Sequence, residues 1–120
     1  MSSPAGNLFA DLRRPETGEV FEELLRLDCK PGVGQVRIER ILSSAQPEPL
    51  LYDQPQDEWV VLLQGHAQLW VDGVDRSLGP GDHLFIPAHT PHRVISTSAD
   101  PPCVWLAVHI HGGREVTGLG

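Results

Sequence analysis

The sequence predicts an all-β domain whose antiparallel strands close into a sandwich or barrel. Short apolar runs, several with a period of two, recur about every ten residues from residue 36 onward. Gly, Pro or Asp bounds nearly every run, and the chain holds 12 Gly and 11 Pro. Because bare sheet edges invite aggregation, so many short strands are expected to close on themselves.

Length and charge narrow the class of protein. The 120 residues match one domain and exclude a large two-domain enzyme. The net charge of −7 repels phosphate backbones, so no nucleic-acid partner is expected. No apolar stretch approaches the ~20 residues that cross a bilayer, and no secretion signal is evident. We therefore expect a cytoplasmic protein without a membrane partner, in which Cys29 and Cys103 are reduced thiols.

The chain divides into an N-terminal arm at 1–20, a barrel at 21–112 and a C-terminal tail at 113–120. Pro and Gly are spread through the arm, so it needs another surface to become ordered. At 19–28, the spacing of Phe21, Leu24, Leu25 and Leu27 fits one short amphipathic helix slightly better than a strand.

The strands expected after this segment lie at 36–41, 59–63, 67–71, 76–78, 84–86, 92–96 and 103–110. Asp72-Gly73 between two of them is a strong hairpin signal. The run from Gly79 to Asp82 predicts a tight turn between the next two. The resulting order of short strands and turns favours a small barrel.

Two stretches carry residues that point to a family. In the first, Glu58 precedes an apolar run that ends at Gly65; in the second, Gly81 and Pro87 precede His92. In order and separation these stretches resemble the two motifs of the cupin family. Residues 36–110 look like the small single-domain bacterial cupins of uncharacterised function. The resemblance implies a cupin-type antiparallel β-barrel that is jelly-roll-like.

The resemblance also implies part of a metal site. Glu58 falls on the family's metal-binding glutamate and His92 on a metal-binding histidine, two of four usual ligands. The positions of the family's His-x-His hold instead Tyr52 and Gln54, or Leu51 and Asp53. In the second motif, His89 replaces a Gly.

The chemistry of these side chains can be considered without the family. A divalent cation such as Zn, Fe, Mn or Ni needs three or four side chains aimed at one point. Glu58 and His92 supply two, and the third stays open among Asp53, Gln54 and His89. Charge favours Asp53 over the neutral Gln54, while a turn can fold His89 and His92 onto one ion. Alternatively no metal binds, and Glu58 is hydrogen-bonded to Arg40, Tyr52 or His92.

Arg40, Tyr52 and Gln54 are further candidates for a pocket. Arg40 continues the face of Val36 and Ile38, and a buried guanidinium needs a partner such as Glu58 or Asp53. Such an arginine would bind a small acid.

His109 shares a strand face with Trp105 and Ala107. If the aliphatic face opposite fills the core, His109 faces outward or meets another subunit. The sequence therefore does not assign His109 to the pocket.

Three functions are compatible with these residues. The first is an enzyme whose metal polarises a small acid or carbonyl compound, and the second is a metal-free module that binds a small metabolite. The third is a structural homodimer joined through exposed apolar strand residues such as Trp70 or Val108.

Overall fold

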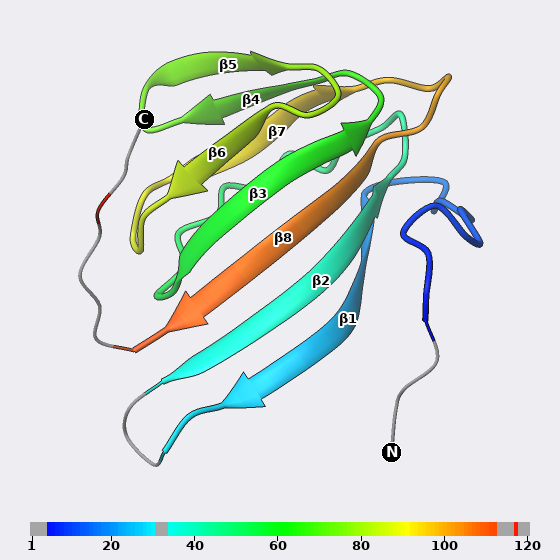
Figure 1. Ribbon diagram of the computed structural model, residues 1–120. Helices are drawn as coiled ribbons and strands as arrows, with labels where there is room; N and C mark the ends of the chain where they lie inside the picture. The colour runs from blue at the N-terminus through cyan, green and yellow to red at the C-terminus, as the bar shows by residue number, and fades with distance from the viewer. Residues whose placement is uncertain (1–4, 31–33, 113–116, 118–120) are drawn as a thin grey trace.

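The computed structural model describes residues 5–30, 34–112 and 117, and within these residues all regular structure is β-strand. The eight strands are antiparallel to their neighbours and form two sheets (Figure 1). The strands are β1 (Glu19–Asp28), β2 (Gln35–Ser43), β3 (Asp57–Gln64), β4 (Ala67–Val71), β5 (Val74–Leu78), β6 (His83–Ile86), β7 (His92–Thr97) and β8 (Val104–His111). The all-β prediction is confirmed.

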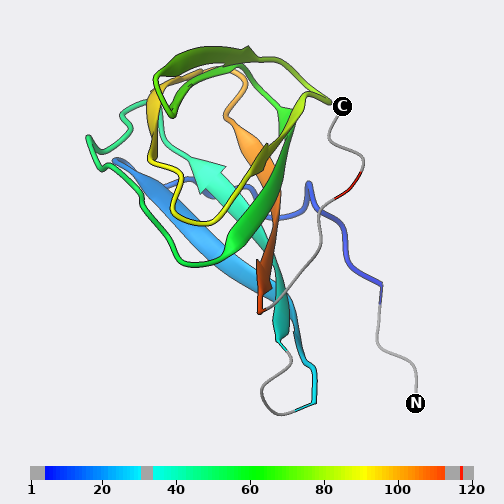
Figure 2. The same cartoon turned by 90° about the vertical axis from the view of Figure 1, so that its left-hand side faces the viewer.

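The two sheets curve around a common interior. One has five strands in the order β1-β2-β8-β3-β6, and the other has three in the order β5-β4-β7. Figure 2 shows the sheets from the side, facing each other across the interior. The core between them contains Leu62, Leu69 and Trp105, all at most 5% exposed. A jelly-roll-like barrel of this kind leaves its centre available for a pocket.

The short helix expected at 19–28 is wrong, because this segment is β1. It pairs with β2 from Glu19↔Ser43 to Asp28↔Gln35. The register shifts between Glu23 and Leu25, so the period of two is interrupted there. This irregularity gives the apolar residues a spacing that imitates a helix. β1 also begins inside the segment expected to be the arm, whereas the expected tail lies outside the described residues except for Thr117.

The faces of β2 and β8 are the reverse of those favoured by the sequence. Trp105 and Ala107 of β8 are buried in the core, and His109 on the same face is 5% exposed. Of the aliphatic residues that alternate with them, Val104 is buried, whereas Leu106, Val108 and Ile110 are only partly buried on the outer face of the five-stranded sheet. His109 therefore faces inward rather than outward.

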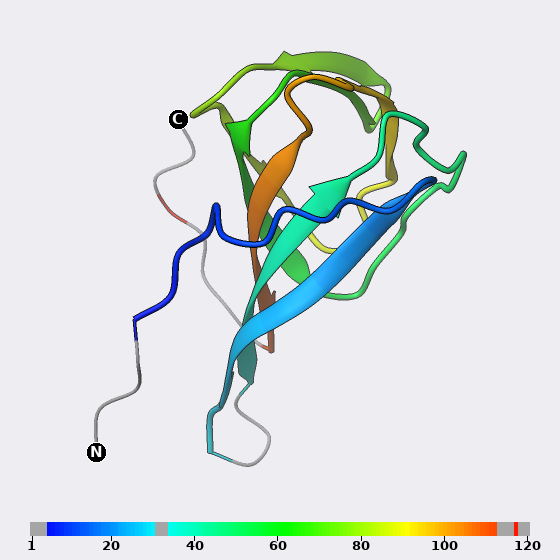
Figure 3. The same ribbon diagram turned by 90° about the vertical axis from the view of Figure 1, so that its right-hand side faces the viewer.

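Arg40 lies on the outer face of β2 and not in the pocket, contrary to the prediction. Its guanidinium donates hydrogen bonds to the carbonyl oxygens of Leu8, Ala10 and Asp11, and its Nη2 lies 2.8 Å from Glu22 Oε1. Figure 3 shows the N-terminal segment, in dark blue, crossing the outer side of the sheet. Arg40 is therefore an anchor for the arm, with a side chain only 8% exposed.

The prediction of a hairpin at Asp72-Gly73 is confirmed. Asp72 and Gly73 have φ values of 46° and 86° and join β4 to β5 in a two-residue hairpin. Cys29 is exposed and Cys103 is buried, and both are free thiols. Within the described part of the chain, no helix is present that could cross a membrane.

Candidate ligand pocket

A cavity of ≈ 80 Å³ lies between the two sheets. Its polar lining comes from both sheets and from the segment before β3, and consists of Glu19, Glu39, Tyr52, Gln54, Glu58, His92 and His109. Its apolar lining consists of Phe21, Ile41, Val60, Leu69, Ile86, Val94 and Trp105. Among the described residues that line it there are three carboxylates and no Lys or Arg, so the pocket is acidic.

Glu58 lies near the start of β3, opposite His109 in the β3–β8 pair. The residue is 8% exposed, and its Oε1 accepts a hydrogen bond of 2.9 Å from Gln54 Nε2. Its second oxygen has no hydrogen-bond partner within the described residues. This oxygen is accessible from the cavity and is a ready acceptor for a ligand.

His92 is held in one orientation by Thr90 and Tyr52. Its Nδ1 lies 2.9 Å from the Thr90 carbonyl oxygen, so Nδ1 carries the proton and donates it. The Tyr52 ring stacks on the imidazole at 5.5 Å between centroids, and the two backbones form a β-bridge. Nε2 of neutral His92 therefore has a free lone pair, in a residue that is 8% exposed.

A second polar group, which the sequence did not identify, lies on the same inner surface. His109 Nε2 is 2.6 Å from Glu39 Oε1, and His109 Nδ1 is 3.2 Å from Gln56 Nε2. Because the Gln56 amide donates, Nδ1 accepts and Nε2 donates to Glu39. The sequence does contain a signal for this group. The period of two puts Glu39 on the same strand face as Ile41, and His109 on the same face as Trp105.

Burial changes the proton affinity of two groups in the pocket. It raises the pKa of Glu19 above the ordinary value of 4.5, and the nearby carboxylates of Glu58, Glu39 and Glu48 raise this pKa further. A hydrogen bond of 2.6 Å from Ser43 Oγ opposes the shift. Burial, followed by the charge of Glu19, also raises the pKa of Tyr52, so its hydroxyl stays protonated and able to donate.

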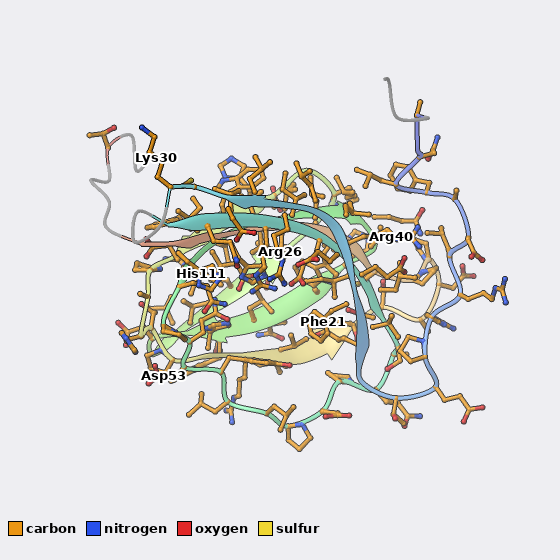
Figure 4. The ribbon with its side chains drawn as sticks, turned by 90° about the horizontal axis from the view of Figure 1, so that it is seen from below. Phe21, Arg26, Lys30, Arg40, Asp53 and His111 are labelled. Carbon is orange, nitrogen blue, oxygen red and sulfur yellow. The ribbon has the colours of Figure 1, made fainter. Side chains whose placement is uncertain are left out.

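Asp53 and His89 lie outside the pocket. Their side chains are 59% and 71% exposed, and Asp53 Oδ1 is 3.2 Å from His89 Nδ1. Figure 4 shows Asp53 at the periphery of the molecule and Phe21 directed from β1 into the space between the sheets. Of the residues expected from the sequence, the structure brings together Tyr52, Gln54, Glu58 and His92.

The side chains of the described residues do not gather into a metal site. Within that part of the chain, no group of three or more His, Cys, Asp or Glu side chains is close enough to hold one ion. Both nitrogens of His109 are engaged by Glu39 and Gln56. The donors that fit a cation are Glu58 and His92, and a complete ligand set is not assembled around them.

An antiparallel β-barrel with a polar pocket between its two sheets defines the class of protein. Residues 41–109 match the family model described as a cupin domain, and the chain belongs to the cupin family. Cupin domains often bind metals and small molecules. A search of curated proteins found no match.

Solved structures give the same fold. A Ralstonia eutropha JMP134 protein, provisionally named mannose-6-phosphate isomerase, is 43% identical over 89% of this chain and 97% of its own, with a TM-score of 0.75. A cupin superfamily protein from Desulfitobacterium hafniense DCB-2 is 18% identical over 92% and 94%, with a TM-score of 0.67. KdgF from a Halomonas species is 18% identical over 96% and 97%, with a TM-score of 0.66.

Proposed function

We propose that the pocket binds a small polar molecule that is uncharged or positively charged. The observation that carries this proposal is the lining of the cavity, where Glu19, Glu39 and Glu58 have no Lys or Arg beside them among the described residues. Apolar walls weaken the screening of these charges, so an anion entering the pocket would be repelled. Carboxylates, an amide and an imidazole can instead accept or donate hydrogen bonds to hydroxyl and ammonium groups.

This proposal differs from the small acid expected from the sequence, because that expectation depended on Arg40 and on a metal held by three or more side chains. The provisional name of the Ralstonia relative suggests a sugar phosphate. A phosphate group would meet carboxylates in this pocket and no lining guanidinium or ammonium group in the described residues. We therefore favour the sugar part of such a ligand over its phosphate.

The test is a set of related sugar compounds with different charges. Glucose, glucosamine, gluconate and glucose 6-phosphate would each be titrated in thermal-shift and calorimetric experiments. We expect the neutral or cationic members to stabilise the protein and the anionic members to have no effect. At one hundred times its dissociation constant a ligand adds about 2.7 kcal/mol to the free energy of unfolding. Tighter binding of the anions would contradict the proposal.

A divalent metal ion is the second candidate for this pocket. It is favoured by the free Nε2 of His92 and by the partner-free oxygen of Glu58, which are donors that Zn, Fe, Mn and Ni accept. When bound, such an ion would polarise a carbonyl or hydroxyl group of a ligand. Metal analysis after reloading with each ion tests this, with His92→Asn and His66→Asn as the matched pair of variants. Equal metal content in both variants would exclude His92 as a ligand.

We also propose that two copies of the chain associate through β1. Among the described residues this edge strand pairs with β2 alone, and four of its apolar residues outside the pocket are 38–52% exposed: Val20, Leu24, Leu25 and Leu27. Trp70, which the sequence suggested, instead packs against the Arg93 guanidinium at 5.6 Å. A second copy would cover both the apolar residues and the unpaired backbone of the edge.

A cytoplasmic location is part of the same proposal. It is supported by the free thiols of Cys29 and Cys103, which suit a reducing compartment. Fractionation of cells that produce the tagged protein would test it. Recovery outside the cytoplasm, with the thiols oxidised, would contradict it.

A further inference from the structure

A second cavity adjoins the pocket. This cavity, of ≈ 100 Å³, shares Glu19, Phe21, Tyr52 and Val94 with the first, and the two therefore adjoin along these side chains. Its remaining lining includes Glu48 and Leu50. The second cavity lies toward the segment between β2 and β3, and we call the two adjoining cavities together the elongated space.

Carboxylates line both cavities, and the section that the cavities share combines the apolar Phe21 and Val94 with Glu19 and Tyr52. Glu39 and Glu58 lie in the inner cavity, Glu19 borders both cavities, and Glu48 lies only in the outer one. No Lys or Arg among the described residues lines either cavity, so these negative charges face one another without a lining cation.

The inner end also presents acceptors that the protein does not use. One oxygen of Glu58 and Nε2 of His92 have no hydrogen-bond partner within the described residues, although each residue is only 8% exposed. Neither atom is itself fully buried, so a ligand in the cavity can reach both, and an ammonium group would supply each with a hydrogen-bond donor. The pKa of Glu19 is raised, since burial and the neighbouring carboxylates disfavour its charge.

We propose that this elongated space binds a linear aliphatic amine with an ammonium group near each end. One ammonium group would lie beside Glu58 and His92 and the other beside Glu48, with the methylene chain along Phe21 and Val94. This inference rests on the proposed function and narrows its ligand to one chemical class. A metal ion or a single sugar ring would interact with one end only, so neither would use both sets of carboxylates.

Calorimetry with compounds of equal length tests the inference. The probes are unbranched α,ω-diaminoalkanes of four to eight carbons, the corresponding monoamines and the corresponding diols. We expect the best diamine to bind at least about tenfold more tightly than the monoamine or diol of the same length. Glu48→Gln should weaken the diamine about tenfold and leave the monoamine unchanged. Glu16→Gln, which alters an exposed carboxylate outside both cavities, is the control.

Each outcome has a definite meaning. A diamine that binds no better than its monoamine, or that binds Glu48→Gln as tightly as the wild type, overturns the inference. If glucose or glucosamine binds and Glu58→Gln abolishes that binding while diamines fail, the inference is wrong and the proposed function stands. If neutral and cationic probes all fail, both are overturned. Circular dichroism of each variant excludes unfolding as the reason for lost binding.

Discussion

His109 Nε2 donates a hydrogen bond of 2.6 Å to Glu39 Oε1 inside the barrel, where both residues are at most 7% exposed. The pair joins β8 to β2 on the inner face, and Gln56 completes it at the other ring nitrogen. This arrangement fixes the tautomer of His109 and places the charge of Glu39 on the pocket wall. The polar character of the pocket is therefore built into the sheet.

Removing the Glu39 carboxylate should destabilise the fold. Glu39→Ala leaves the buried Nε2–H of His109 without an acceptor, which costs about 1–3 kcal/mol. Glu39→Gln retains an acceptor oxygen and should lose less. Chemical denaturation of the two variants measures the difference, and equal stability of Glu39→Ala and wild type would show that the hydrogen bond contributes nothing.

The Arg40 anchor predicts a coupling between the arm and stability. Arg40→Met removes the hydrogen bonds to Leu8, Ala10 and Asp11, and we expect a loss of about 1–3 kcal/mol together with faster proteolysis within residues 5–14. Arg26→Met breaks a pair with Glu23 whose side chains are 49% and 41% exposed, so it should cost less than about 1 kcal/mol. Unchanged proteolysis in Arg40→Met would contradict the anchoring role.

Glu19 predicts how stability depends on pH. Its pKa in the folded protein is raised above 4.5, so the folded state binds the proton more tightly than the unfolded state. Stability should therefore fall as pH rises from about 4.5 through the folded pKa, because burial, and then the charges of Glu58, Glu39 and Glu48, disfavour ionised Glu19. Glu19→Gln removes this loss and keeps a partner for Ser43. Melting temperatures of both proteins across this range should diverge as pH rises, and parallel curves would refute the assignment.

Association through β1 predicts a dimer that charge can dissociate. Light scattering at micromolar concentration should give twice the chain mass for the wild type. Replacing the exposed Leu25 and Leu27 with Glu should give a monomer, since like charges would face each other across the edge. Leu51→Glu, at an exposed site away from β1, should remain a dimer. A monomeric wild-type protein would contradict the proposed association through β1.

Alanine substitutions at Gly65 and Gly73 allow the cost of backbone strain to be distinguished from the cost of side-chain crowding. Both have positive φ, 92° and 86°, so alanine at either position should cost about 1–2 kcal/mol. At Gly65 an added Cβ would also lie 2.8 Å from Cys103 Sγ, whereas at Gly73 nothing lies within 4 Å. Gly65→Ala should therefore be the more destabilising by a further 1–3 kcal/mol or so. Denaturation midpoints compare the two, and equal losses would mean that the Cys103 contact relaxes freely.

Local patterns were sufficient to predict the seven strands after β1 and the Asp72-Gly73 hairpin, because alternation and turn chemistry act between near neighbours. The resemblance to the cupin motifs singled out Glu58 and His92, and both line the pocket. The helix expected at 19–28 failed because pairing with β2 and a register shift outweigh a short apolar spacing.

Alternation defines two faces of a strand but does not say which of them is covered. In the structure His109 and Glu39 lie on the inner face and Arg40 lies on the outer face. The arm crosses this outer face and supplies carbonyl oxygens as hydrogen-bond partners for Arg40. The amino-acid sequence alone was thus sufficient to predict the strands, the turns and the family. The acidic lining of the pocket came from contacts between residues far apart in the chain, such as Glu39 and His109, which no local period can specify.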